Sequence, residues 1–326
     1  MGVVLKIPKE LEQMYDSDPE VFIRDVANFP QETVSRYFKI PGAIYKSISR
    51  ARKNPFDFMT HRFDDDFRGH DFKPRFLHFD LSMGGDLCSF AMGHASGFIE
   101  VNKIVEGNLV ADKLPFVYID FVGIMYVEKN EEVWLPRIPE IVEELTSRHF
   151  NIQLLTFDRF QSAYIIQLLK DRGYLADVLS IDRTTTKIIV DITRDDRIRR
   201  ESTKGNYLAG VASLKDAMNQ FRISIPYHPA VRTRTAESQF ELEAKAAQHY
   251  VDKMKVDHGS GGSIDVVQAI AGTCFNIECN CRDFQIIDDI KNVGDTFYEN
   301  AKAGYVTLDQ GDFEKGGGRR HESYLG

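Results

Sequence analysis

The chain has 326 residues, of which 43% are hydrophobic, so it is long and apolar enough to bury a sizeable core. No apolar run reaches the length that spans a bilayer, and the N-terminus lacks the basic start and apolar stretch of a signal peptide. These absences argue against a membrane or secreted protein, and we expect a soluble intracellular one. The formal net charge of −8 does not exclude a nucleic-acid partner, because such binding depends on local basic surface.

The first part of the chain is predicted to pass from an irregular segment into a strand hairpin. Residues 1–70 are rich in charge and aromatic side chains and are expected to form short helices and loops. Residues 76–82 have strand-like apolar content and lead into a turn at 83–86. A returning strand is predicted over 87–95, and a third strand over 116–127, where Val, Ile, Phe and Tyr are frequent.

The pattern then alternates between helices and strands. A helix is predicted over 139–149, where Pro139 suits the first helical position, followed by a short apolar strand over 152–157. An amphipathic helix over 161–170 stops at Gly173, and a fifth strand follows over 174–181. Three consecutive strands followed by this alternation indicate an α/β fold with a mixed β-sheet flanked by α-helices.

The remaining third of the chain is predicted to be mostly helical. Helices are expected near 206–220, 237–254 and 264–276, and the sequence becomes polar beyond about residue 282. We therefore expect a lead-in segment (1–70), an α/β domain (71–282) and a polar C-terminal tail (283–326).

The cysteines permit two interpretations. Three of the four form a C-x4-C-x-C cluster, Cys274, Cys279 and Cys281, and Cys88 lies far from them in sequence. A zinc site is one alternative, but the spacing differs from paired C-x2-C ligands and no fourth ligand is evident. Reduced structural thiols are the favoured interpretation.

Three aspartates occupy positions where a carboxylate is unusual. Asp80 lies in or at the end of an apolar strand, Asp158 follows a buried-type strand, and Asp265 opens an apolar helix. A buried carboxylate is costly unless its charge is compensated, and Mg²⁺ or Mn²⁺ compensates it well. The alternatives stay open at this point: Asp265 can favour the helix dipole, and Asp158 can be a turn residue.

Four stretches of the sequence occur in an order that resembles a known family. They are 79–86 (FDLSMGGD) continuing to 91–94 (AMGH), 155–162 (LTFDRFQS), 180–184 (SIDRT), and 256–258 (VDH) continuing to 261–269 (GGSIDVVQA). Together they resemble the C-terminal nuclease region of the large terminase subunit of tailed bacteriophages. The resemblance covers about residues 75–278.

This resemblance implies a ribonuclease H-like fold and a metal-dependent endonuclease. It implies that Asp80, Asp158 and Asp265 are the catalytic, metal-binding trio, with Asp86 as an auxiliary metal ligand and His258 close to the site. The cofactors would be two Mg²⁺ or Mn²⁺ ions, and the substrate double-stranded DNA, cut from viral concatemers during genome packaging. The implied partners are the terminase ATPase domain, the small terminase subunit and the portal, in the cytoplasm of the host cell.

The sequence also departs from the family pattern. Ile264 stands where the family often has Lys, and Gln268 where it often has a second acid, so a fourth ligand on that helix lacks support. The phosphate loop that marks the family's ATPase motor, G-x-x-x-x-G-K followed by Ser or Thr, does not occur. We therefore expect an excised fragment or a split gene product, and the resemblance gives no translocation activity to this chain.

A basic stretch follows the fifth predicted strand and suggests contact with DNA phosphates. Its members are Arg194, Arg197, Arg199, Arg200 and Lys204. Lys73 and Arg75 are similar candidates before the first strand. The alternative is a solvated polar loop, because acidic residues are interspersed.

Two other functions also stay open at this point. One is a junction-resolvase type of ribonuclease H-like nuclease. The other is a non-catalytic module that docks DNA or the portal.

Overall fold

The computed structural model describes most of the chain, and the statements below concern these residues. They are 7–11, 34–81, 87–105, 108–125, 135–158, 162–181, 186–191, 197–203, 208–231, 233, 235–250, 253–259 and 262–291. The contacts divide the chain into two units, Met1–Phe284 and Gln285–Gly326. The elements discussed here belong to the first unit, except that the last residues of α8 (Asp265–Lys291) belong to the second. Within the described residues, no helix has both the length and the apolar character needed to cross a lipid bilayer.

Among the described residues, the central sheet has seven strands in the order β2–β12–β7–β6–β5–β8–β9. Their bounds are β2 (Ile48–Lys53), β5 (Arg75–Asp80), β6 (Cys88–Val105), β7 (Asn108–Met125), β8 (Ile152–Phe157), β9 (Ala176–Val178) and β12 (Ile223–Tyr227). Strand β6 runs antiparallel to β5 and β7, whereas the other neighbouring pairs are parallel. The strands β5 to β9, numbered one to five along the chain, lie side by side in the order 3-2-1-4-5, with the second reversed. This is the ribonuclease H-like arrangement, so the predicted fold class is confirmed.

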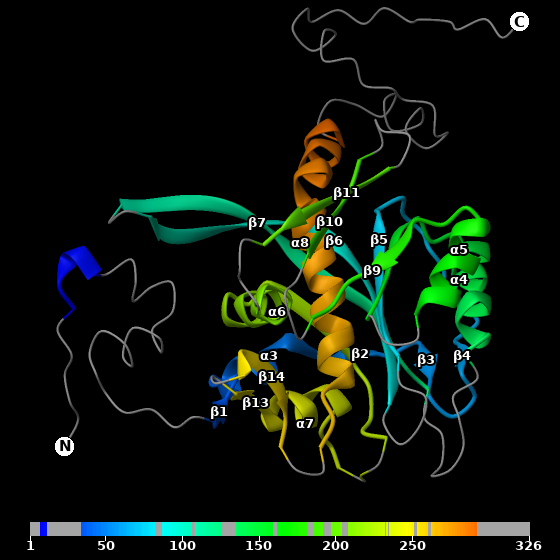
Figure 1. Cartoon of the computed structure of the whole chain (residues 1–326), viewed down its shortest axis with the longest axis horizontal. Helices are drawn as coiled ribbons and strands as arrows, with labels where there is room; N and C mark the ends of the chain where they lie inside the picture. The colour runs from blue at the N-terminus through cyan, green and yellow to red at the C-terminus, as the bar shows by residue number, and fades with distance from the viewer. Residues whose placement is uncertain are drawn as a thin grey trace, which may run out of the picture. The chain divides into compact units, whose positions relative to one another are not determined.

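Smaller sheets and helices surround the central sheet (Figure 1). The small sheets pair β1 (Val34–Arg36) with β13 (Ala247–Tyr250) and β14 (Lys255–His258), β3 (Phe56–Asp57) with β4 (Arg62–Phe63), and β10 (Thr186–Val190) with β11 (Ile198–Ser202). The helices are η1 (Lys9–Leu11), α3 (Pro41–Ser47), α4 (Arg137–Ser147), α5 (Ala163–Asp171), α6 (Ala209–Asn219), α7 (Gln239–Ala246) and α8 (Asp265–Lys291). Helices α4 and α5 pack on each other, one on each side of β8 in the sequence.

One face of the central strands is covered by stacked aromatic rings. The ring of Phe79 on β5 lies 4.7 Å from Phe157 on β8 and 5.3 Å from Phe90 on β6, measured between centroids. A Cβ added at Gly123 on β7 would lie 2.1 Å from the Phe90 ring, so glycine makes room for this ring. These rings supply much of the apolar burial that stabilises the middle of the sheet.

Helix α8 crosses the opposite face of the sheet, where Figure 1 shows it in orange. The Thr273 hydroxyl donates to the Ala91 carbonyl at 2.9 Å, and the Asn276 amide donates to the Thr156 hydroxyl at 2.7 Å. A Cβ added at Gly272 would lie 2.2 Å from the buried His78 ring. The glycine therefore lets the helix backbone approach β5 closely.

Several elements extend beyond the predicted ranges. Strands β6 and β7 each have 18 residues, against predicted strands of 87–95 and 116–127, because their pairing continues outward to Val105 and Asn108. Each strand satisfies the backbone groups of the other there, so pairing does not require a hydrophobic pattern. Helix α8 continues through Lys291, past the predicted end at residue 276 and the predicted tail boundary at 282.

Two other predictions differ in kind. Residues 1–70 were expected to contain only short helices and loops, yet β2 pairs with β12 at the edge of the central sheet. Within β2 only Ile48 is buried, so an edge strand forms there without the alternating apolar pattern. The helix predicted over 237–254 ends at Ala246, and the chain continues directly into β13.

Candidate functional site

Asp80 and Asp158 lie at the ends of neighbouring parallel strands. Asp80 is the last residue of β5 and is 8% exposed, and Asp158 is the first residue after β8. The backbone N–H of Asp158 donates to the Phe79 carbonyl at 2.9 Å, which continues the ladder between the two strands. The carboxyl ends of parallel strands meet at one edge, so both aspartates stand at the same edge of the sheet.

The two aspartates also belong to the same face of the sheet. His78 Nδ1 and Thr156 Oγ1 lie 2.9 Å apart on the side that α8 covers. Side chains two residues apart on a strand share a face. Asp80 therefore lies on the same face as His78, and Asp158 on the same face as Thr156, in each case two residues further along the chain. Burial lowers the pKa of His78 to about 3, so this ring stays neutral beneath the acids.

Asp265 reaches the same edge from the start of α8. Its Oδ2 accepts a hydrogen bond from the Leu87 backbone N–H at 2.9 Å and from the Ser263 hydroxyl at 2.8 Å. Leu87 lies two residues before Ser89, whose Cα pairs with that of Asp80. Asp265 is therefore held at the start of β6, the strand that pairs with β5 next to Asp80.

Another carboxylate caps the first turn of α8. The backbone N–H groups of Val266 and Val267 both donate to Oε2 of Glu243 on α7, at 2.8 and 3.1 Å. Burial raises the pKa of Glu243 to about 8. The N–H groups at these two positions, which have no partner within the helix, are therefore satisfied by Glu243.

The donor chemistry of this edge suits a hard cation, because carboxylate oxygens are the ligands that Mg²⁺ and Mn²⁺ prefer. Within the described residues, however, no three His, Cys, Asp or Glu side chains stand close enough together to hold a metal ion. A shared ion between Asp80, Asp158 and Asp265 therefore stays a prediction. Asp86 lies outside the described residues. His258 makes local contacts instead, with its Nδ1 2.6 Å from the Gly259 carbonyl oxygen.

The described part of the predicted DNA-binding stretch contributes β11, which pairs antiparallel with β10, and its described arginines differ from one another. Arg200 makes two hydrogen bonds to Asp177 on β9, at 2.7 and 2.6 Å, and these raise the pKa of Arg200. Arg199 pairs with Glu201, and Arg197 is exposed with a φ of 47°. The other two members of the cluster, Arg194 and Lys204, lie outside the described residues.

The β10–β11 hairpin is fixed to both the sheet and α8. Asp177, which is 3% exposed, has Thr156 as its Cα partner on β8, two residues before Asp158. On the helix side, the Asn280 side chain accepts from the Val190 N–H at 2.8 Å and donates to the Ile188 carbonyl at 3.1 Å. The hairpin is thus attached close to the acidic edge.

The cysteines whose side chains are described are free thiols. Cys88 and Cys274 are buried, and Cys279 is half-buried. Burial raises the pKa of the Cys274 thiol well above its usual value. None of these three thiols joins a metal-binding group among the described side chains, and their interpretation as reduced structural thiols stays a prediction.

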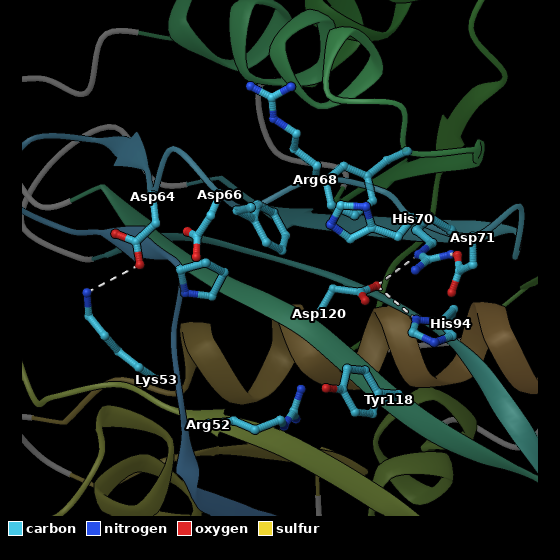
Figure 2. A pocket seen from close by; sticks show the side chains of 14 residues that line it. Arg52, Lys53, Asp64, Asp66, Arg68, His70, Asp71, His94, Tyr118 and Asp120 are labelled. Atoms are coloured by element: carbon cyan, nitrogen blue, oxygen red, sulfur yellow. Dashed lines mark hydrogen bonds and ion pairs between the residues drawn. The ribbon is translucent and has the colours of Figure 1, made fainter.

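A cavity of about 710 Å³ lies at the opposite edge, which sequence reasoning did not identify (Figure 2). Asp120 at its centre accepts from Arg75 Nε at 3.2 Å and lies 3.0 Å from His94 Nδ1. Arg75 is buried and also pairs with Asp71, so it does not act as the DNA contact suggested by its sequence position. Lys53 pairs with Asp64. The basic and acidic side chains that line the cavity thus neutralise one another, whereas the edge at Asp80 carries acidic side chains.

The sequence carried one signal for this cavity. Asp120 interrupts an apolar strand much as Asp80 does. It is the extra residue of a β-bulge, because Met92 pairs with Phe121 and Gly93 with Ile119. A bulge cannot be read from the sequence alone, since it depends on the register of two strands.

The strand order and the acids at one edge define this chain as a ribonuclease H-like α/β protein. No family model and no curated protein sequence matches it. Among solved structures it is similar to the large terminase of bacteriophage HK97, with 12% identity and a TM-score of 0.42, over 82% of this chain and 49% of that one. It is also similar to the large terminase nuclease of the thermophilic phage G20c, with 12% identity and a TM-score of 0.43, over 73% and 96%. The chain thus spans about half the length of the HK97 protein.

Proposed function

We propose that this chain is a divalent-metal-dependent endonuclease that cuts double-stranded DNA during viral genome packaging. The observation that carries the proposal is the placement of Asp80 and Asp158 at the ends of adjacent parallel strands, with Asp265 hydrogen-bonded beside them. Three carboxylates from separate parts of the sequence thus come to one edge of the sheet, and divalent cations would compensate their negative charge there.

The proposed chemistry assigns a role to each part of the site. Two Mg²⁺ or Mn²⁺ ions, when bound, activate a water and stabilise the leaving oxygen of a phosphodiester. Asp80, the most buried of the three aspartates, would hold the ions together with Asp158 and Asp265. The exposed basic side chains Arg197 and Arg199 bind phosphates of the DNA backbone and align the strand with the acids.

The biological setting of the proposal rests on the sequence resemblance. The four ordered motifs resemble large terminase nucleases, which implies cutting of concatemeric viral DNA in the cytoplasm of the host cell. The proposed partners are the terminase ATPase domain, the small terminase subunit and the portal. Asp86 is proposed as an auxiliary ligand on the segment between β5 and β6.

The direct test is plasmid cleavage in the presence of Mn²⁺ or Mg²⁺ by Asp80→Ala and Asp158→Asn. We expect both variants to lose cutting down to the level without metal, because each removes a negative ligand. Asp171→Asn, an exposed aspartate on α5, is the matched control and should cut like the unmodified chain. Circular dichroism and thermal unfolding verify that each variant is folded. Undiminished cutting by a folded Asp80→Ala variant contradicts the proposal.

The same assay separates the two alternatives. Preference for a four-way junction over linear duplex would identify a resolvase-type nuclease. DNA binding without any metal-dependent hydrolysis by the unmodified chain would identify a docking module.

A further inference from the structure

A buried carboxylate on α7 holds the first turn of α8 from outside that helix. Glu243 is 2% exposed, and its Oε2 accepts from the backbone N–H groups of Val266 and Val267. Its other oxygen, Oε1, accepts from the Gln239 side chain at 2.9 Å. Both oxygens of Glu243 are therefore engaged, one of them entirely with the backbone of α8.

Glu243 and Asp265 have different roles at the start of α8: Glu243 accepts from the helix backbone, and Asp265 contacts the segment before β6. The first N–H groups of a helix lack partners within the helix, and a side chain at the helix start usually supplies one. The N-cap position of α8 is Ile264, whose apolar side chain cannot accept a hydrogen bond, and Oδ2 of Asp265, the first helical residue, receives the Leu87 N–H and the Ser263 hydroxyl. Glu243 supplies the cap, and Asp265 extends to the strand edge.

The two carboxyl groups also lie within electrostatic reach of each other. The charge of Asp265 adds to burial in raising the pKa of Glu243. A buried acid near a second carboxylate is costly to keep charged.

We propose that Glu243 is a positioning residue for the metal site, because it fixes the first turn of α8 so that the Asp265 carboxylate stays directed at the edge shared with Asp80. The inference rests on the proposed function, since it takes Asp265 to be a metal ligand. It assigns Glu243 no contact with the cation or with DNA. Its effect is transmitted through the backbone of Val266 and Val267.

The test measures Mn²⁺ binding by isothermal titration calorimetry in the full chain. Glu243→Met keeps the side-chain volume but removes the acceptor, and we expect Mn²⁺ affinity to fall about 10- to 100-fold, as for loss of a residue that orients a ligand. Glu243→Gln retains an oxygen that can accept the same two N–H groups. It should therefore keep Mn²⁺ affinity within about threefold of the unmodified chain, since the supporting contacts survive.

The matched control is Glu241→Met on the same helix. Glu241 is also 2% exposed and also accepts from a backbone N–H, that of Ser238, but it belongs to the cap of α7 and pairs with Arg50. Its replacement should lower the midpoint of thermal unfolding and leave Mn²⁺ affinity unchanged. This separates positioning of the metal site from general stability.

Two results overturn the inference: unchanged Mn²⁺ affinity in folded Glu243→Met, or equal weakening by Glu241→Met. If Glu243→Met does not fold, Glu243→Asp replaces it, since the shorter side chain withdraws the acceptor from α8, and the same weakening is expected. Absence of Mn²⁺ binding and of metal-dependent cleavage in the unmodified chain refutes the proposed function itself. That outcome is distinct from failure of the Glu243 inference.

Discussion

His228 is a fully buried histidine whose neighbours select its neutral form. The Phe240 backbone N–H donates to its Nε2 at 3.3 Å, so Nδ1 carries the proton that is shared with the Pro226 carbonyl at 2.9 Å. Burial lowers the pKa of His228 from 6.5 to about 4. Protonation in the folded chain would place an additional charge in the core between α7 and β12.

The contribution of His228 to the free energy of unfolding should therefore fall in mild acid. The folded-state pKa of His228 lies below its unfolded value, so its stabilising contribution is present above about pH 6.5 and is lost as the pH falls toward 4. Between pH 7 and pH 5 the loss is about 2 kcal/mol. In urea unfolding at both pH values, the unmodified chain should lose about 2 kcal/mol more than His228→Gln, because the shifted pKa values of His78 and Glu243 contribute equally to both chains. Equal pH dependence in both chains contradicts the assignment.

At the scale of single residues, the candidate acids were visible in the sequence and their supports were not. Asp80, Asp158 and Asp265 stand out because a carboxylate beside an apolar run is unusual. Glu243 does not stand out, because acidic residues are common on helices that face solvent. Its burial arises from a contact with residues more than 20 positions later, which no local pattern encodes.

Two adjacent arginines on β11 differ in their contacts. Arg200 points to the buried Asp177, whereas Arg199, its neighbour, has only an exposed partner in Glu201. Exposed ion pairs contribute little, so Arg199 remains available to a phosphate. In the described part of the predicted basic cluster, Arg200 is attached to the sheet, whereas Arg199 is exposed and stays a proposed DNA contact.

This division predicts different results for two adjacent arginines. Arg199→Ala should weaken DNA binding and reduce the dependence of affinity on salt by about one phosphate contact, without lowering thermal stability. Arg200→Ala should lower the midpoint of thermal unfolding, because it leaves the Asp177 carboxylate buried and unpaired. Fluorescence anisotropy at several salt concentrations and thermal unfolding measure the two effects.

The control for the second effect is Asp177→Asn in the Arg200→Ala background. Removing the charge should restore part of the lost stability. Identical behaviour of Arg199→Ala and Arg200→Ala in both measurements would contradict the division.

The bounds of helices and strands were predicted well where burial requires apolar residues at regular positions in the sequence. Strand β8 matches its predicted bounds because both of its faces lie in the core, and α4 matches to within two residues because one face is buried. Strand β2 was missed because its sequence, ISRARK, is polar and its pairing with β12 comes from the tertiary fold. The outer parts of β6 and β7 were missed for the same reason.

For the whole molecule, the segment before residue 71 completes the sheet. The Asn54 side chain donates to the Val122 carbonyl and accepts from the Val122 N–H, both at 2.8 Å, as a neighbouring strand would. Phe56 and Phe63 pack against Phe121, with centroids 6.2 and 4.9 Å apart. The predicted domain of residues 71–282 lacks these contacts.

A chain of residues 71–284 should therefore fail to unfold cooperatively, whereas a chain of residues 34–284 should retain a single thermal transition. The shorter chain exposes the backbone of β12 and the aromatic face of β7, and the resulting apolar surface should bind a hydrophobic dye. Differential scanning calorimetry and dye fluorescence make the comparison. Cooperative unfolding of the 71–284 chain would show that the lead-in segment is dispensable.

A single helix, α8, contacts both the acidic edge of the sheet and the β10–β11 hairpin. Asp265 at its start and Asn280, which holds the hairpin, are 15 residues apart, or about 22 Å along the axis. A slide of the helix by a single ångström would lengthen the Leu87–Asp265 bond and the Asn280–Val190 bond together. The position of the Asp265 carboxylate and the position of the β10–β11 hairpin are thus coupled through α8. A force on the helix beyond Asn280 would therefore break both hydrogen bonds together.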